Sequence, residues 1–279
     1  MSFPAPSRQA PSGRRRIGPL LPTVLILGGL LLLLLVLAQF WTEVLWFSQV
    51  GYVEVIRTQW VAQGLLGLVG GLIMAASVFL NLTVAYRSRP VYAPATAEQQ
   101  SLDRYRESIE PLRRVVTIGA PLLLGAFAGA AVSARWQSVI LWLNREEFGE
   151  SDPQFGLDLS FYVFTLPAAR FVVSYLMTVV FLSAAVAVVT HYLYGGIRLT
   201  APGVRVTTAA RRQLAVLGAV FVVLIGVNYW LDRYSLLVKT GERFDGATYT
   251  DINAVLPAKT ILAGIAVLVA ALFVVTALR

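Results

Sequence analysis

Two polar segments of the chain concentrate side chains whose types could bind a metal ion. The first carries Glu147, Glu150, Asp152 and Asp158, and the second carries Glu242, Asp245 and Asp251. Carboxylate oxygens of this kind are the ligands that hard cations such as Ca²⁺ prefer. Their spacing does not match an EF-hand loop, however. We therefore expect no metal site and interpret these acids as surface and turn-forming residues.

Residues that could carry out nucleophilic or acid–base catalysis are scarce in this chain. It has no cysteine and a single histidine, His191. The sequence also lacks a glycine-rich phosphate loop, a G-x-S-x-G elbow, and H-E-x-x-H or C-x-x-C spacing. Most nucleophile–base and metal-hydrolase chemistries therefore lack a necessary residue. We expect no enzymatic activity and no cofactor, and an interfacial or packing role for His191.

The elements that must position these residues are six apolar runs, each free of Asp, Glu, Lys and Arg. They lie near 20–41, 61–86, 115–134, 171–194, 214–231 and 260–278. A helix of about 20 such residues spans the ~30 Å hydrocarbon layer of a bilayer. The predicted fold class is an all-α integral membrane protein, a bundle of about six transmembrane helices with interfacial helices in its loops. Because no charged residue lies within the runs, a proton pump or ion-coupled carrier confined to them is disfavoured.

Basic and acidic residues divide unevenly between the two sides of such a bundle. The side with both termini and the connections near 87–114 and 195–213 holds 15 basic and 4 acidic residues, and the other holds 8 and 11. This asymmetry predicts that both termini are cytoplasmic and that the basic side contacts anionic headgroups. It also argues against nucleic acid as the reason for the net charge of +8. We expect residues 1–19 to be a disordered basic cytoplasmic tail and 20–279 to be the transmembrane helical domain.

The connections between the runs differ in character. The one at 42–60 is short and aromatic, and such residues suit the headgroup level of a membrane. The one at 87–114 includes an amphipathic patch, Leu102, Tyr105 and Ile109, at helical spacing. The one at 232–259 is predicted to be an ordered loop with little regular structure.

The connection at 135–170 is the most distinctive. It is predicted to begin with an interfacial helix near 136–143, turn at Asp152-Pro153 and return to the membrane through an apolar segment. Aromatic residues are too dense between Phe155 and Phe164 for a solvated loop, so we expect an ordered, partly embedded platform. Asp158 and Ser160 offer oxygens to backbone N–H groups that would otherwise lack partners.

Small residues recur at helix-packing spacing in two of the runs. Gly67 and Gly71 form one GxxxG pair, and Gly125 and Gly129 form another. Such pairs let helix backbones approach closely. The spacing is compatible with packing inside one bundle, which we favour, or with a seam between copies of the chain.

Three segments have distinctive motifs: the stretch from Trp41 to Tyr52, the stretch from Phe148 to Pro167, and Tyr249-Thr-Asp-Ile-Asn followed by Leu256-Pro257. They resemble the signatures of Uncharacterised Protein Family 0182, a family of large bacterial multi-pass proteins. The residues that carry the likeness are Trp46, Gly51, Tyr52, Asp152, Pro153, Phe155, Gly156, Asp158, Phe161, Tyr162, Pro167 and Asp251. The resemblance implies that these residues form a structural motif and that the protein lies in the bacterial plasma membrane. It also implies about seven spans followed by a long extracytoplasmic domain, of which this chain would be only the N-terminal membrane part.

The function that we expect is a non-enzymatic membrane anchor or scaffold for an envelope-facing domain or protein partner. The alternative is a component of a transporter or lipid-export assembly. Polar residues within the runs, such as Ser77, Asn81 and Asn228, are too few and too scattered to line an obvious path. An intramembrane enzyme lacks a convincing acid–base set.

Overall fold

A computed structural model describes residues 20–90, 113–200, 203–241 and 245–279. The expected tail at 1–19 and the amphipathic patch at 102–109 lie outside these residues. The chain divides into two compact units, 1–59 and 60–279. Each unit is described below by itself.

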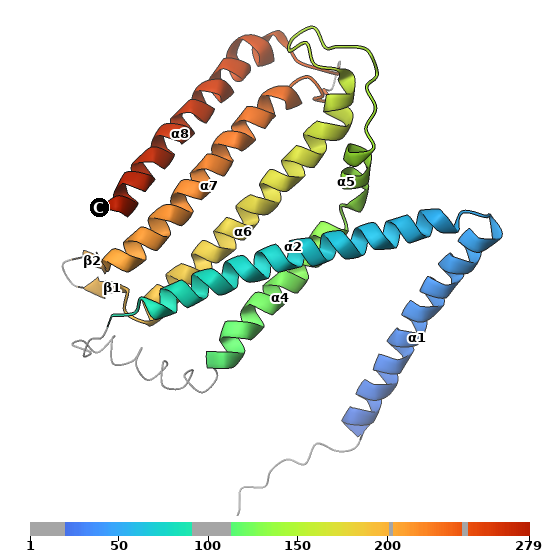
Figure 1. Cartoon of the computed structure of the whole chain (residues 1–279), viewed down its shortest axis with the longest axis horizontal. Coiled ribbons are helices and arrows are strands. Elements are labelled where there is room, and N and C mark those ends of the chain that lie inside the picture. Colours follow the sequence, from blue (N-terminus) through green and yellow to red (C-terminus); the bar gives the residue numbers. More distant parts are fainter. Residues whose placement is uncertain (1–19, 91–112, 201–202, 242–244) are drawn as a thin grey trace, which may run out of the picture. The chain divides into compact units, whose positions relative to one another are not determined.

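Helices dominate both units (Figure 1). Within the described part of the chain, six are long and apolar enough to cross a membrane. They are α1 (Leu20–Gln49), α2 (Val53–Arg87), α4 (Arg113–Ser133), α6 (Leu166–Leu193), α7 (Thr208–Ser235) and α8 (Leu256–Leu278). A shorter helix, α5 (Trp136–Leu143), has no buried residue, as befits an interfacial segment. These elements confirm the predicted all-α fold class.

The first unit shows that the expected connection at 42–60 is largely helical. No Gly or Pro lies between Thr42 and Ser48, so nothing stops α1 before the turn at Val50–Tyr52. Gly51 forms this turn with a φ of 77°, a conformation that glycine adopts without strain. Tyr52 closes the turn by donating its N–H to the Phe47 carbonyl at 3.0 Å.

In the second unit, α6, α7 and α8 lie side by side as an antiparallel row (Figure 1). Small residues let α7 and α8 approach closely. A Cβ added to Gly226 of α7 would lie 3.1 Å from the Cβ of Ala266, which is buried on α8. In a bilayer the hydrophobic effect does not drive helices together, because lipid tails are as apolar as the helix surface. Close packing of the backbones is therefore a main source of attraction between the helices.

Helices α2 and α4 cross at the two GxxxG pairs. A Cβ on Gly129 would lie 2.5 Å from the Gly67 carbonyl oxygen, and one on Gly125 would lie 2.8 Å from the Gly71 oxygen. The structure thus brings all four glycines together within one chain. Larger side chains at this crossing would force the two backbones apart.

Two segments expected to be loops prove to be helical extensions. A π-helical turn, η2 (Phe161–Thr165), leads into α6, and a second, η3 (Asp251–Val255), leads into α8. We expected these spans to start later, near 171 and 260. Pro167 and Pro257 occupy the first turn of these helices, where the missing N–H breaks no hydrogen bond of the helix.

A two-stranded antiparallel hairpin joins α6 to α7, and the sequence did not predict it. Its strands are β1 (Ile197–Thr200) and β2 (Gly203–Val206). We call the end of the α6–α8 row that carries it the hairpin end. The opposite end, which carries residues 144–160, 236–241 and 245–255, is called the loop end.

Candidate functional site

Polar side chains at the loop end are held in a dense set of hydrogen bonds, and Asp152 organises the first part. This carboxylate is buried and accepts backbone N–H groups of Gln154, Phe155 and Leu157 at 2.8, 2.6 and 3.0 Å. It also accepts the hydroxyl of Tyr162 at 2.8 Å. Burial alone would raise the pKa of Asp152, but these hydrogen bonds outweigh it and leave the pKa below its ordinary value.

Asp158 closes the other side of the same loop. Its carboxylate accepts the N–H groups of Phe148 at 3.1 Å, Gly149 at 2.9 Å and Ser160 at 2.8 Å. Hydrogen bonds from Ser160 first, and then from Phe148 and Gly149, lower the pKa of Asp158 to about 2. The expectation that Asp158 supplies oxygens to loop N–H groups is therefore confirmed. Both carboxylates are engaged within the protein, which leaves them poorly suited to bind a cation.

Aromatic rings attach this loop to the end of α7. Tyr234 lies 4.8 Å from Phe155 and 5.2 Å from Phe161, measured between ring centroids. Arg233 stacks over Trp230 at 4.1 Å and lies 5.7 Å from the Phe155 ring. The buried Nε and Nη1 atoms of Arg233 make no hydrogen bond, and the guanidinium group lies against aromatic rings instead. The loop is thus an ordered layer that packs against a membrane helix.

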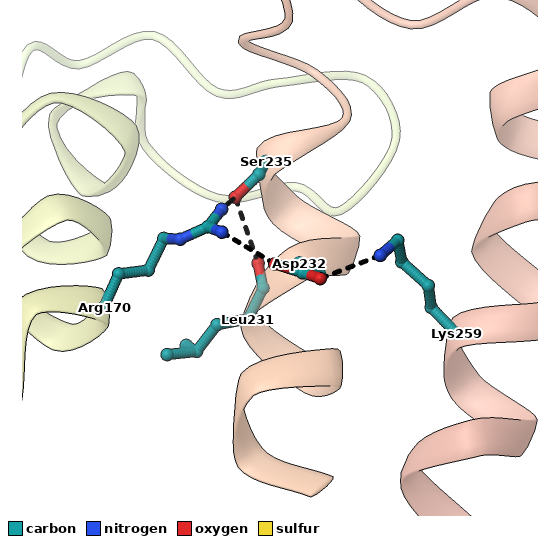
Figure 2. A network of polar contacts seen from close by, with 5 residues as sticks. All are labelled: Arg170, Leu231, Asp232, Ser235 and Lys259. Carbon is teal, nitrogen blue, oxygen red and sulfur yellow. Dashed lines mark hydrogen bonds and ion pairs between the residues drawn. The ribbon is translucent and has the colours of Figure 1, made fainter. Parts of the chain in front are cut away.

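Asp232 of α7 joins three helices through ion pairs (Figure 2). Its Oδ1 accepts from Arg170 of α6 at 2.8 Å, and its Oδ2 accepts from Lys259 of α8, also at 2.8 Å. Arg170 donates a further hydrogen bond to Ser235, one turn further along α7. The central helix of the row therefore holds both neighbours at the loop end through a single carboxylate.

The two basic residues that pair with Asp232 lie in segments of similar sequence. Arg170 follows Leu166-Pro167-Ala-Ala, and Lys259 follows Leu256-Pro257-Ala. In each case a π-helical turn comes first, closed by the N–H of that leucine onto the carbonyl of Phe161 or Asp251. Such turns are rare and are frequent at functional sites. Leu-Pro-Ala before a basic residue is the sequence signal that could have identified this pair.

Asp251 performs the same kind of task in the second loop. It is buried and accepts the N–H and hydroxyl of Thr248 at 3.0 and 2.8 Å. Its own N–H donates back to the Thr248 hydroxyl oxygen at 3.1 Å, and Lys239 lies 3.6 Å from its carboxylate. This reciprocal bonding fixes the start of η3.

The sequence-predicted residues fall into four places. The loop end holds Asp152, Pro153, Phe155, Gly156, Asp158, Phe161, Tyr162 and Pro167 in one assembly, with Asp251 in the neighbouring loop. Trp46, Gly51 and Tyr52 belong to the first unit, and the four glycines form the α2–α4 crossing. Sequence reasoning missed Arg170, Asp232, Arg233, Tyr234 and Lys259, because nothing in the sequence placed the ends of three helices together.

A partly buried polar chain also runs between α2, α6 and α7 towards the hairpin end, with Ser183 and His191 buried. Ser77 and Ser183 share a hydrogen bond of 2.8 Å. Gln213 donates to the Asn81 carbonyl at 2.9 Å, and its Oε1 lies 2.9 Å from Nε2 of His191. His191 is therefore buried in the helix packing, which bears out the packing role among the two that we expected.

Comparison with known proteins yields several relatives whose only description is the family name. A UPF0182 protein of Arthrobacter sp. (strain FB24) is 46% identical over 277 residues, covering 99% of this chain and 28% of the relative. A UPF0182 protein of Streptomyces coelicolor is 45% identical over 271 residues, covering 95% of this chain and 27% of the relative. The chain thus spans little more than a quarter of the length of these relatives.

No solved structure matches the chain significantly. The model of the uncharacterised protein family UPF0182 matches residues 20–279, which include both units from the start of α1 onward. The segments that carried the resemblance lie within this match. The chain belongs to the UPF0182 family.

Proposed function

We propose that the chain is a non-enzymatic membrane anchor or scaffold whose loop end supports an envelope-facing domain or protein partner. In this proposal it lies in the bacterial plasma membrane, with both termini and the hairpin end in the cytoplasm. The hairpin end then contacts anionic headgroups, and the loop end faces the envelope.

The observation that carries the proposal is that the carboxylates at the loop end are bonded to groups of the same chain. Asp152, Asp158, Asp232 and Asp251 each bond to several groups of the same chain. A catalytic or transport site needs polar groups that are free to engage a substrate. These carboxylates instead fix loops and helix ends, as a rigid support requires.

A support also needs exposed surface for its partner. Tyr249, two residues before η3 in the second loop, is 84% exposed, and Phe148 in the first loop is 51% exposed. Both lie next to the residues that order their loops. Aromatic side chains on a fixed backbone are typical anchors of protein interfaces because they bury large area with little loss of freedom.

Photo-crosslinking in cells of the source bacterium tests this proposal. A photoreactive residue replaces Tyr249, Phe148 or, as a lipid-facing control, Leu272 of α8, which is 68% exposed. A scaffold gives one discrete protein adduct at the two loop positions and none at the control. The adduct weakens when Asp232→Asn loosens the helix ends. Equal labelling at all three positions contradicts the proposal.

The second candidate is a component of a transporter or lipid-export assembly, and the polar chain between α2, α6 and α7 is the feature through which it can be tested. A path through the bundle would bring water to these groups. Single cysteines at Ser183 or Asn81 can be tested with a membrane-impermeant thiol reagent, since the chain has no other cysteine. Reaction at either site supports a path. No reaction, with full labelling at an exposed control such as Tyr249→Cys, supports packing alone.

A further inference from the structure

Helices α2 and α4 border a cavity of about 300 Å³ beyond their glycine crossing, which we call the α2–α4 cavity. Its described lining residues belong to 79–87 of α2 and 114–118 of α4. The cavity therefore lies between the crossing and the α2 end at Arg87. That end is close to the hairpin end of the row, because the guanidinium group of Arg89 lies 5.9 Å from the ring of Tyr194, the residue just after α6.

Among the side chains that line this cavity, both helices repeat one order. From the crossing outward, each helix offers an apolar residue, then a threonine and then an arginine. These residues are Phe79, Thr83 and Arg87 on α2, and Ile118, Thr117 and Arg114 on α4. The helices run in opposite directions, since Gly71 meets Gly125 and Gly67 meets Gly129 at the crossing. Both arginines consequently lie at one end of the cavity, and both apolar residues lie at the other.

The two arginines of the cavity are exposed and are not neutralised by the described part of the chain. Neither Arg87 nor Arg114 makes a hydrogen bond, an ion pair or a ring contact with a described residue. The described residues that line the cavity include no acid. One turn along α2 from Arg87, the Oγ1 atom of Thr83 is enclosed without a hydrogen-bond partner, which is unfavourable for a polar group. A small rotation of this side chain brings its hydroxyl to an acceptor inside the cavity.

A tyrosine in the wall of the cavity is held in place by its neighbours. Tyr86 lines the α2–α4 cavity and also a second, mostly apolar cavity of about 340 Å³ between α2, α4 and α6. Arg89 donates a hydrogen bond to its hydroxyl at 2.6 Å and lies 4.3 Å from its ring centroid. The ring of Tyr194 meets it edge-on at 5.0 Å. This wall is therefore ordered before a ligand binds, and a preformed site loses little freedom on binding.

We propose that the α2–α4 cavity binds one anionic phospholipid. Its phosphate accepts hydrogen bonds from Arg87 and Arg114, because guanidinium groups match phosphate in charge and geometry. The two threonines lie at the level of the glycerol esters, and an acyl chain follows the apolar residues. Lipid is the favoured source of phosphate because the cavity lies on two membrane-spanning helices and is apolar at its inner end. This assignment rests on the proposed contact between the hairpin end and anionic headgroups, and it names where one lipid is held.

Lipid quenching tests the assignment on the whole chain in nanodiscs. A fluorophore is attached to Leu122→Cys, which supplies the only thiol of the protein at an exposed position one turn beyond Ile118. Nanodiscs contain phosphatidylglycerol and phosphatidylcholine, with brominated chains on one lipid or the other. We expect brominated phosphatidylglycerol to quench more strongly at equal mole fraction. Arg87→Gln with Arg114→Gln lowers the apparent affinity for this lipid by about fivefold per arginine.

Two matched variants separate this site from the general contact. Arg211→Gln with Arg212→Gln removes two exposed charges of the hairpin end outside the cavity, and it leaves the preference at position 122 nearly unchanged. Equal losses in the two double variants indicate a diffuse contact and overturn the assignment. Ile118→Trp fills the apolar end of the cavity but keeps both arginines, and it lowers the affinity to a similar extent as the loss of the arginines. An unchanged affinity in this variant overturns the cavity as the site. An equal lack of preference in every variant, parent included, overturns the general contact as well.

Two further arms identify the source of phosphate and guard against misfolding. Inorganic phosphate, compared with chloride at matched ionic strength, leaves the lipid preference intact. Loss of the preference in phosphate alone assigns the site to a free anion and overturns the lipid proposal. Thermal unfolding in pure phosphatidylcholine nanodiscs shows whether the variant without Arg87 and Arg114 is folded. If it is not, Ile118→Trp decides, because a loss of the preference is then required.

Discussion

Replacing Asp232 by Asn removes one negative charge while keeping the shape of the side chain, so it isolates the ion pairs at the loop end. Each pair has an N–O distance of 2.8 Å. The side chain of Asp232 is 17% exposed, whereas those of Lys259 and Arg170 are 23% and 40% exposed. A hydrogen bond between charged groups contributes about 1.5–3 kcal/mol, and exposure reduces this figure.

We therefore assign about 1.5 kcal/mol to the Lys259 pair and, because its side chain is more exposed, about 1 kcal/mol to the Arg170 pair. Asp232→Asn also leaves two cations facing a neutral amide. The expected loss in the free energy of unfolding is roughly 2–3 kcal/mol. The matched control is Asp245→Asn, an exposed acid of the same end, whose change should stay within about 0.5 kcal/mol.

Unfolding in mixed micelles of increasing SDS fraction, followed by tryptophan fluorescence, measures these differences. A double-mutant cycle between Asp232→Asn and Lys259→Gln should return a coupling of about 1–2 kcal/mol. A cycle with Arg170→Gln should return about 1 kcal/mol. If Asp232→Asn behaves like Asp245→Asn, or if both couplings vanish, the three helix ends are not held through this carboxylate.

The remaining predictions concern the first loop, the glycine crossing and the topology. Asp158→Ala should speed hydrogen exchange of the amides at 148–160 while leaving the spans protected. The folded pKa of Asp158, about 2, lies below the ordinary value of 3.8. Its carboxylate therefore stabilises the loop above about pH 4, and this contribution fades as the pH falls towards 2. Exchange of the parent loop that is equally fast at pH 6 and pH 2.5, after correction for intrinsic rates, would contradict this. Gly67→Leu and Gly125→Leu should each lower the melting temperature in detergent, since either side chain separates α2 from α4; unaltered melting of both would mean that the crossing contributes nothing. A cysteine at position 245 should react with an impermeant thiol reagent in intact cells and one at position 87 should not, and the reverse pattern would invert the proposed topology.

The number of long helices was predictable because each span is a long run without charge, and the bilayer sets the required length. Helix ends were predicted less well, since they depend on contacts that the sequence does not show. The run from Phe161 to Arg170 is helical, and its first turn packs on Tyr234, a residue on a different helix. In the same way, the N–H of Leu166 closes the π turn onto the Phe161 carbonyl, so Pro167 lies in the first turn of α6 without breaking the helix.

The residues of the candidate site also differ in how far the sequence could predict their partners. Asp152 and Asp158 act on backbone groups within ten residues of themselves, so turn chemistry could identify Asp158 as a capping residue. Asp232 acts on Arg170 and Lys259, which lie 62 and 27 residues away. A single carboxylate near the end of an apolar run gives no indication of such partners. Only the placement of three helices side by side defines the site.

At the loop end of the α6–α8 row, the central ion pairs lie within the chain. Asp232 is shared between Arg170 and Lys259, so one carboxylate links the ends of three helices. At the hairpin end, Arg198 and Arg205 lie directly opposite each other across the two strands, and Arg211 and Arg212 are exposed at the start of α7. Like charges placed side by side hold no elements together, whereas a shared carboxylate does. The loop end is therefore the end of the row whose charged groups fix the helices in place, as the proposed scaffold requires.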